Sequence, residues 1–550
     1  MMKACLKDIA EDYFNFLAKS FPVMCASDEF HFLPRAQAAG KYLDRMENLQ
    51  KDSIFDTISF LKEFRNGLDG LSIQESDIEG HTDLELLKSS VAGALVELEV
   101  YQPWRHNPLL YLKIAFIGLD QTINKPASGE NERRGRIQAR LEEIPRLLSQ
   151  AMNNLEEVPE TYLQASRAML KDGRLYLQEI GSSQAERAPL ASMKVIHKTL
   201  DSLNIFDRFL GEIIPVHDRI IFIPAIKENL KDYYFSFRTL PEISQLAEQE
   251  IQECLMELEK LGAKVDPEKS WLELYDSYLP GELDKIDTMS LYDREIESLS
   301  LFFQENGFAE TGMQTSFELC ETPTYLRSIR SSASFSAALN TSGGEKDFFY
   351  ITTNMPGEGS QAEKESQKNR LHREYKFLSA HEVIPGHHQL DYERRKQKNL
   401  IRRQIESPLF YEGWASYAET LLSEYGYVED PLDRLVDYKR RLWRVARCKI
   451  DLGLNAGNLS RKEALQTLTE MGFTPGEAER QVNRIQLNPG YQLCYFLGRY
   501  EIVNLRKCCE KPLELDRFHQ LLLEGGELPF RLIEKRLKAF DADSTQSEEE

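Results

Sequence analysis

Apolar residues recur at steps of three and four along most of the chain, with polar residues between them. Residues 132–155 and 243–261 show this spacing over long windows. Because about 3.6 residues complete one helical turn, this pattern predicts amphipathic helices. Strand patterns are sparse, and the two best are RIIFIP at 219–224 and FFYITT at 348–353. The sequence therefore predicts a mainly α fold that includes a small β-sheet.

Explicit start signals mark helices near the C-terminus. Residues 460–463 (SRKE) and 474–477 (TPGE) both match a capping box, in which a Ser or Thr and a later Glu cap the first turn. Asp430-Pro431 indicates another helix start, and this helix can continue to about Asn455, before Gly457.

Boundaries between domains are hard to find in this sequence. The Gly/Ser-rich residues 340–344 and the polar run 357–368 are interpreted as surface loops that flank the FFYITT strand. The last residues, 541–550, are acidic and lack apolar side chains. We therefore expect a single large domain over residues 1–540 and a disordered tail at 541–550.

The net charge and the cysteine pattern limit the kinds of partner, disulfide and metal site that are expected. The chain carries 68 basic and 89 acidic residues, a formal net charge of −21. This excess of negative charge disfavours binding to nucleic acid or to an anionic membrane. The eight cysteines are scattered without a CxxC spacing, so neither a disulfide framework nor a cysteine zinc site is expected.

The first twenty residues bear on the cellular location. Charged side chains stand at Lys7, Asp8, Glu11 and Asp12, where a signal peptide would need an unbroken apolar stretch. No apolar window of about 18 residues, the length that spans a bilayer, occurs elsewhere. Together with cysteines that fit a reducing compartment, these features predict a cytoplasmic protein.

Candidate chemistry is concentrated in one short segment. Of ten histidines, three fall in HEVIPGHH at 381–388. In HExxH metallopeptidases two histidines four residues apart share a helix face and hold zinc, while the intervening Glu acts as general base. This chain has His381-Glu382 but carries Pro385 where the second histidine would stand.

The geometry of the segment allows a later histidine to act as the second metal ligand. On a straight helix six residues advance about 9 Å and turn about 600°, which leaves His387 roughly 120° off the face of His381. Pro385 and Gly386, however, force the helix to bulge or break, and this can return His387 to that face. His388, about 20° off but more than roughly 10 Å along a straight helix, is the alternative ligand or a supporting group.

A third ligand is expected downstream, because catalytic zinc commonly has three protein ligands and one open position. The segment FYEGWASYAE at 410–419 has the pattern of a helix. Glu412 is the natural third ligand. Glu419, seven residues later on the same face, can brace a ligand histidine, and Trp414 is interpreted as core packing behind Glu412.

Three motifs together resemble a known family. HEVIPGHHQ, FYEGWASYAE and NPGYQLCYFLG are similar to motifs of the bacterial family called domain of unknown function 885. Weaker similarity at 321–327, 348–350 and 107–111 extends the resemblance over roughly residues 100 to 505. The family's fold is similar to the helical glutamate-zincin peptidases, which include thermostable carboxypeptidases, oligopeptidases and angiotensin-converting enzymes.

This resemblance implies a large two-lobed helical metallopeptidase-like fold, with the small β-sheet beside an active-site cleft and a catalytic core at about 320–505. It implies His381, His387 and Glu412 as Zn²⁺ ligands and Glu382 as general base. Tyr495 is the first candidate for a hydrogen bond to the oxyanion. Tyr491 and Arg484 fall in the same stretch and are further candidates for this role, for contact with the substrate or for support of the ligands.

Other residues complete the hypothesis. The FFYITT strand can serve as an edge that pairs with an extended peptide, or as an ordinary sheet strand. His106 can reach the cleft. Four arginines are candidates for clamping a peptide carboxylate: Arg327, Arg330, Arg484 and Arg499.

The expected function is a zinc metallopeptidase that hydrolyses short peptides, of carboxypeptidase or oligopeptidase type. Two alternatives remain open at this point. One is a zinc amidase or hydrolase that acts on a non-peptidic metabolite. The other is a catalytically silent binding protein on the same fold.

Overall fold

The chain is mainly helical in the computed structural model. The residues that the structure describes are 5–74, 76–182, 192–216, 222–280, 285–308, 317–330, 332–340, 344–353, 361–507 and 515–538. They form helices α1 to α21 and one sheet of three strands. The predicted mainly α fold with a small β-sheet is therefore confirmed.

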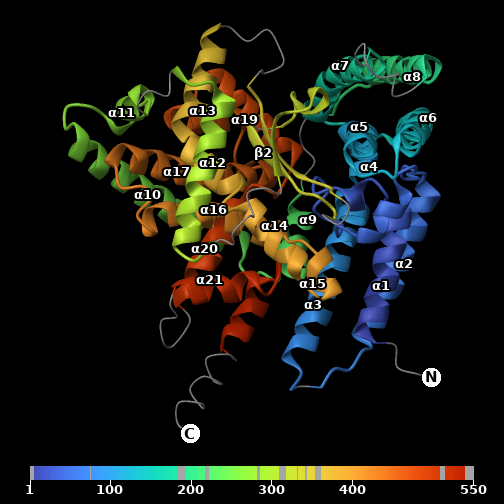
Figure 1. The fold of residues 1–550 in the computed structure, drawn as a ribbon, viewed down its shortest axis with the longest axis horizontal. Helices are drawn as coiled ribbons and strands as arrows, with labels where there is room; N and C mark the ends of the chain where they lie inside the picture. The colour runs from blue at the N-terminus through green and yellow to red at the C-terminus, as the bar shows by residue number, and fades with distance from the viewer. Residues whose placement is uncertain are drawn as a thin grey trace.

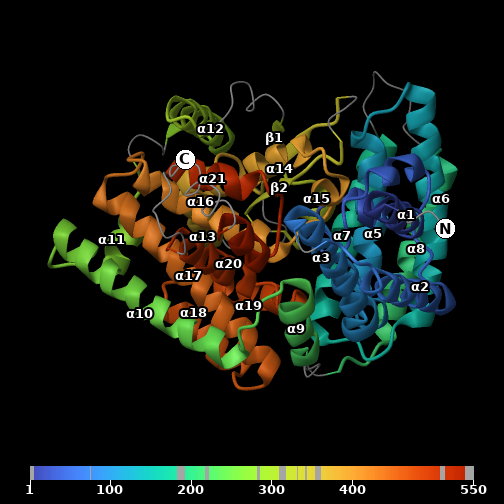
Figure 2. The ribbon, with the colours of Figure 1, turned by 90° about the horizontal axis from the view of Figure 1, so that it is seen from below.

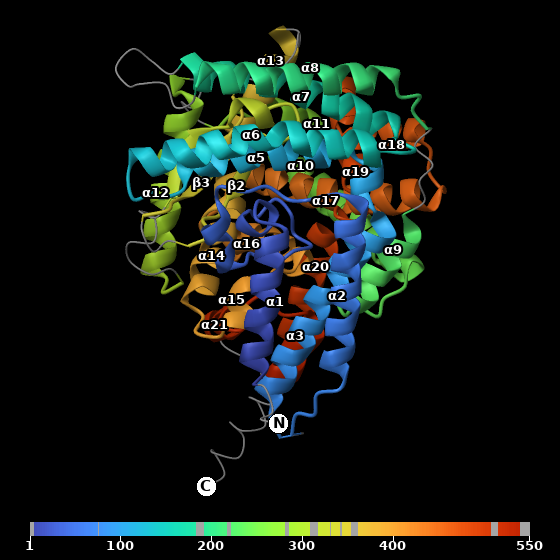
Figure 3. The same cartoon turned by 90° about the vertical axis from the view of Figure 1, so that its right-hand side faces the viewer.

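Helices α1 to α8 form one side of the molecule (Figure 1). Figure 3 shows α5 to α8 lying across the top of this side, with α1 to α3 running crosswise below them. Their bounds are α1 Leu6–Ser20, α2 Lys51–Asp69, α3 Ile78–Leu95, α4 Pro103–His106, α5 Pro108–Asn124, α6 Glu130–Asn154, α7 Glu160–Ser182 and α8 Met193–Glu212.

Helices α10 to α13 and α16 to α21 form the opposite side, and two views show the sheet between the groups (Figures 1 and 2). Helix α15 packs against α1 and α3. Helix α10 packs along α17, and α16 packs along α20. Their bounds, with that of the preceding α9, are α9 Ile223–Glu228, α10 Leu240–Val265, α11 Trp271–Ser277, α12 Thr288–Glu305, α13 Gln361–Glu382, α14 His387–Lys396, α15 Leu400–Gln404, α16 Pro408–Glu424, α17 Pro431–Ala456, α18 Arg461–Glu470, α19 Pro475–Leu487, α20 Leu493–Lys507 and α21 Leu515–Leu523.

Short helical segments of other types join these elements. Three are 3₁₀ turns and two are π-helical turns: Met24–Ala26, Gln37–Tyr42 and Thr324–Leu326, then Val96–Tyr101 and Asn229–Tyr233. A cluster of buried apolar side chains extends through both groups of helices, from Ala10 in α1 to Leu523 in α21. None of the described helices combines the length and apolar character needed to cross a membrane. The predicted domain limits stay predictions.

The structure confirms the predicted helix starts near the C-terminus. The boxes at 460–463 and 474–477 are formed, with Ser460 and Thr474 capping α18 and α19. Helix α17 begins at Pro431 and ends before Gly457, as the sequence predicts. These signals act within one turn, so the local sequence is sufficient to place them.

The sheet has the strand order β1-β3-β2, with β1 Phe317–Glu321, β2 Ala333–Ser336 and β3 Asp347–Ile351. Strand β3 pairs parallel with β1 and antiparallel with β2. The predicted strand FFYITT is therefore confirmed, but its use as a peptide-binding edge is wrong, because β3 is paired on both sides. The edge strands of the sheet are β1 and β2.

Two further predictions need correction. The RIIFIP strand is wrong where it is described, since α9 begins at Ile223 with Pro224 in its first turn, a position that suits proline; residues 219–221 lie outside the described part. The polar run 357–368 is not a loop throughout, since α13 begins at Gln361 and packs against α12. Residues 341–343, 357–360 and the tail 541–550 lie outside the described residues.

Candidate metal centre

The break predicted at Pro-Gly separates two helices. Helix α13 ends at Glu382 and α14 begins at His387. A side chain at Gly386 would not fit, because its Cβ would lie 1.9 Å from the carbonyl oxygen of His381. Trp414 holds the turn from the other side, donating its indole N–H to the carbonyl of Pro385 at 2.9 Å. The turn returns His387 to the neighbourhood of His381.

Helix α16 supplies the third group. The backbones of α16 and α20 approach so closely that a Cβ added to Gly413 would lie 2.5 Å from the Cα of Gly498. Glu412, the residue before this contact, points its carboxylate at the two histidines. Its Oε2 atom lies 3.6 Å from Nε2 of His381 and 3.6 Å from Nε2 of His387.

These three side chains fit a zinc ion. Their ligand atoms lie within 4.8 Å of one another, and all three residues are buried. A tetrahedral zinc with bonds of about 2.1 Å separates its ligand atoms by roughly 3.4 Å, close to the 3.6 Å between Oε2 of Glu412 and Nε2 of each histidine. Among the described residues, Oε2 of Glu412 has no hydrogen-bond partner, although it is buried. A cation between the three groups would satisfy it.

Glu419 supports the first histidine. Its Oε1 lies 3.0 Å from Nδ1 of His381, so the ring can donate there and keep Nε2 free for a metal. Arg440 and Arg444 both bind the same carboxylate. Burial alone would raise the pKa of Glu419, but the two arginines hold it well below its usual range. Glu419 is therefore ionised and braces His381, as the sequence predicts.

Glu412 is held on its second oxygen. Tyr491 donates its hydroxyl to Oε1 at 2.6 Å and also lies 3.2 Å from Nε2 of His31. Although burial favours the neutral acid, contact with His381 and His387 lowers the pKa of Glu412 well below its usual value. The hydroxyl of Tyr491 is occupied by Glu412, so this tyrosine orients the side chain of the candidate ligand.

Glu382 has a free carboxylate beside the cluster. It is 7% exposed and lines both cavities that meet at the site. Among the described residues its carboxylate makes no hydrogen bond or ion pair. Burying a carboxylate without a partner costs free energy of folding. Carboxylates kept in this state are typical of functional sites, where they can accept a proton.

The ring of Tyr495 lies nearly parallel to that of His381. The centres of the two rings are 6.2 Å apart, and the guanidinium carbon of Arg447 lies 4.2 Å from the centre of the Tyr495 ring. Burial, followed by the charge of Glu412, raises the pKa of Tyr495 far above its usual value. The phenol therefore keeps its proton at neutral pH and can donate it in a hydrogen bond.

His388 turns away from the cluster. Its Nε2 lies 3.3 Å from Oδ2 of Asp347, and its ring meets the edges of Phe317 and Phe335. Helix α14 starts at His387, so the next side chain along the helix points toward the sheet. The structure thus brings His387 to His381 and Glu412. His388 instead contacts Asp347, the first residue of β3.

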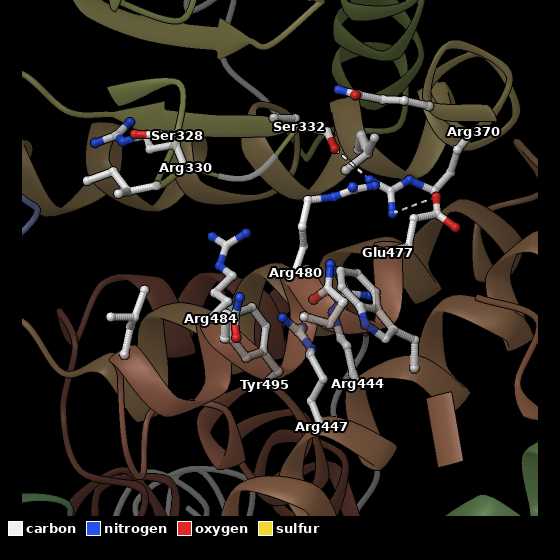
Figure 4. A pocket seen from close by; sticks show the side chains of 18 of the residues that line it. Ser328, Arg330, Ser332, Arg370, Arg444, Arg447, Glu477, Arg480, Arg484 and Tyr495 are labelled. Atoms are coloured by element: carbon white, nitrogen blue, oxygen red, sulfur yellow. Dashed lines mark hydrogen bonds and ion pairs between the residues drawn. The ribbon is translucent and has the colours of Figure 1, made fainter. Parts of the chain in front are cut away.

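Two adjoining cavities reach the cluster. The larger, of about 360 Å³, lies between α7, α13, α17 and α19 (Figure 4). The smaller, of about 170 Å³, contains all three candidate ligands. Both are lined by His381, Glu382, Arg484 and Tyr495, and Ala333 of β2 borders both. The sheet therefore lies beside the cleft.

Of the remaining residues that the sequence predicts at the site, some line its cavities and others do not. Arg330 and Arg484 line both cavities. Arg327 donates to the carbonyl of Thr322, and Arg499 pairs with Glu250, so neither reaches the cluster. His106 lines a separate cavity and contacts the carbonyl of Glu156. The long-range pairing of these side chains was not visible in the sequence.

Several neighbours of the site were not predicted from the sequence. Tyr411 stacks on His387 with ring centres 3.9 Å apart, and His31 arrives from the segment after α1. Arg444 and Arg447 come from α17. Their spacing with Arg440 on one helix face was the available signal, because positions three and four apart lie side by side.

The fold resembles two solved structures. One is a "putative lipoprotein of unknown function" from Shewanella oneidensis, with a TM-score of 0.75 at 18% identity over 97% of this chain and 100% of that one. The other is a "putative lipoprotein" from Colwellia psychrerythraea, with a TM-score of 0.76 at 16% identity over 98% of this chain and 99% of that one. At these identities the likeness concerns the fold. A comparison with the curated proteins finds no match.

The solved structures contradict the prediction of a cytoplasmic location, because both are described as lipoproteins, a class attached to membranes. That prediction is wrong. It relied on charges at residues 7–12, which belong to α1, a helix that buries one face in the core. Such a segment is part of the fold and does not report the compartment.

The family model settles the classification. The model described as "bacterial protein of unknown function (DUF885)" matches residues 227–537. This range contains α13, α14, α16 and α20, which carry the ligand cluster and Tyr495. The match covers more than half of the sequence, and the chain therefore belongs to the bacterial family DUF885.

Proposed function

We propose that this protein is a zinc-dependent metallopeptidase that hydrolyses short peptides, of carboxypeptidase or oligopeptidase type. The convergence of His381, His387 and Glu412 supports this most strongly, since their ligand atoms lie within 4.8 Å of one another. Two histidines and one glutamate form a known ligand set of catalytic zinc. Such a set leaves one position open for water or substrate, whereas structural zinc sites are closed.

The surrounding residues have matching roles. Zinc bound here would polarise a peptide carbonyl and make a nearby water more acidic. Glu382, with its free carboxylate at the cavity wall, accepts a proton from the attacking water and returns it to the leaving amine. Tyr495 donates its O–H to the oxygen that gains negative charge, because its raised pKa keeps the phenol protonated.

Metal analysis tests the centre first. We expect purified protein to hold about one zinc per chain, and His381→Ala and Glu412→Ala to lose it. His197→Ala is the matched control, since His197 is exposed on α8, far from the ligand cluster in sequence and element. Wild type without zinc, or ligand variants that keep it, would exclude the metal centre.

Turnover tests the chemistry. A mixed peptide library analysed by mass spectrometry should show trimmed or cleaved products with wild type. Glu382→Gln should retain zinc and lose about 10²- to 10⁴-fold in rate, the usual contribution of a general base. Cleavage at wild-type rate by this variant would refute the role of Glu382. Zinc binding without peptide cleavage would favour a non-peptidic substrate or a silent protein.

A further inference from the structure

The larger cavity beside the metal centre is rich in arginine. Among the described residues, seven arginines and three glutamates line it. Figure 4 shows Arg370 of α13, Arg444 and Arg447 of α17, and Arg480 and Arg484 of α19 around the cavity. Arg330, from the segment before β2, is paired with Glu29 at 2.8 Å. This local charge is opposite to the net charge of the chain, which is −21. The chain's overall charge therefore does not predict what this cavity attracts.

Several of these charges are already neutralised within the protein. Arg440 and Arg444 share the carboxylate of Glu419. Arg370 lies 3.9 Å from Glu477 and donates to Ser332. These groups stabilise the wall of the cavity and leave little charge for a ligand.

Three arginines differ from the rest. In the part of the chain that the structure describes, Arg447, Arg480 and Arg484 have no carboxylate partner. Arg480 is exposed and Arg484 is half-buried, and neither guanidinium makes a hydrogen bond to a described residue. Both project from α19, and the four-residue spacing places them on one face of that helix.

Arg447 is the deepest of the three. It is 3% exposed, and its contacts are Gln492 Oε1 at 3.1 Å and the rings of Trp443 and Tyr495. Its Nε is buried without a hydrogen-bond partner among the described residues. Burial, together with the nearby Arg444 and Arg484, lowers the pKa of Arg447 to about 10, so it is still charged at neutral pH. A buried cation without an anion is costly, and a bound anion relieves that cost.

This cationic group lies within reach of the metal centre. The ring of Tyr495 stands between them, 4.2 Å from the guanidinium carbon of Arg447 and 6.2 Å from the ring of His381. An extended peptide advances about 3.5 Å per residue. An anion at Arg447 therefore belongs to a peptide residue only a few positions from the bond at the metal.

We propose that this cavity binds a carboxylate of the peptide substrate, held by Arg447 and Arg484, with Arg480 drawing it in from solvent. The inference rests on the proposed function and names the substrate class: peptides that carry a carboxylate close to the cleaved bond. Guanidinium groups bind carboxylates through paired N–H donors, which suits this task. The carboxylate is either the C-terminal one or that of an acidic side chain.

Three synthetic peptides separate these sources. They are Ala-Ala-Phe-Gln with a free C-terminus, the same peptide as a C-terminal amide, and Ala-Ala-Phe-Glu as a C-terminal amide. Binding is measured by calorimetry on the zinc-loaded Glu382→Gln protein, so that no turnover is required. We expect one or both carboxylate peptides to bind about 10- to 100-fold more tightly than the Gln amide, as for hydrogen bonds to charged groups.

Charge-removing variants test the clamp. Arg484→Gln should reduce that preference to near one, and Arg447→Gln should do the same if it folds. Arg208→Gln, which removes an exposed charge on α8, is the matched control and should keep the preference. An unchanged preference in Arg484→Gln, or equal binding of all three peptides to the parent, overturns the inference.

Failure of the carboxylate-binding inference can be distinguished from failure of the proposed peptidase function. Arginine-dependent binding of a carboxylate peptide without cleavage by wild type would support the cavity and refute the peptidase. If wild type cleaves peptides equally well with and without the carboxylate, the peptidase is supported and the carboxylate-binding cavity is refuted.

Discussion

Glu419 connects the ligand histidine His381 to two buried arginines. Its carboxylate accepts from Nδ1 of His381 at 3.0 Å and is bound by Arg440 and Arg444. This arrangement selects the tautomer that leaves Nε2 of the imidazole free, because the proton is held at Nδ1. Glu419 thus orients a candidate metal ligand without belonging to the candidate cluster itself.

We expect Glu419→Gln to weaken zinc binding by about 10- to 100-fold, as for other partners of metal-bound histidines. The amide keeps the shape of the side chain but removes the charge that orders His381. Titration against a competing chelator measures the affinity. Glu424→Gln is the control, because it lies on the same helix with its side chain 35% exposed. Equal affinities for the two variants would contradict the bracing role.

At the scale of elements, the turn between α13 and α14 brings His387 into the candidate metal cluster with His381 and Glu412. A straight continuation would carry His387 away from His381, whereas the turn restores it. Gly386 makes this possible, since a Cβ there would lie 1.9 Å from the carbonyl of His381 and 2.3 Å from that of Ala380. The departure from the HExxH spacing is therefore compensated by the backbone.

Gly386→Ala should force the two helices apart, with a loss of stability of at least about 2 kcal/mol, the range of overpacked sites. Zinc content should fall with it, because His387 moves. Urea unfolding and metal analysis measure the two effects. Gly135→Ala in α6 is the control: nothing lies within 4 Å of its added Cβ, and alanine should stabilise that helix by about 1 kcal/mol. Wild-type zinc content in Gly386→Ala would show that the turn tolerates a side chain.

For the whole molecule, one buried histidine couples stability to pH. His519 of α21 is packed against Trp414 and Tyr417 of α16, the helix that carries Glu412. Burial, with a smaller effect of Arg506, lowers the pKa of His519 to about 3. In the unfolded chain its pKa is about 6.5. Between these values the unfolded state binds a proton that the folded state does not, so folding weakens as pH falls.

His519→Gln should remove this contribution. A single such group changes the free energy of unfolding by about 1.4 kcal/mol per pH unit below about 6.5. Urea unfolding at pH 7 and pH 5 should therefore show a smaller acid-induced loss of stability in the variant than in wild type. His197→Gln, at an exposed position on α8, should behave as wild type. An identical loss in His519→Gln and wild type would refute the assignment.

Features with local causes were predicted well from the sequence. The capping boxes that start α18 and α19 and the proline start of α17 depend on side chains within one turn. The Pro-Gly break after Glu382 follows from the missing N–H of proline. The strand prediction is wrong over the described residues 222–224, because Pro224 also suits the first turn of a helix, and only packing chooses between the two.

The sequence by itself determined the helical class, the helix break and the residue types able to hold a metal, because these follow from periodicity, backbone sterics and side-chain chemistry. Only the tertiary structure decided that His387 rather than His388 faces Glu412, and that β3 is central in the sheet. It also decided that Arg447 and Arg484 meet in one cavity. These outcomes depend on contacts between α7, α13, α16, α17 and α19, which lie far apart along the chain. Their geometry is set by packing, which no local pattern encodes.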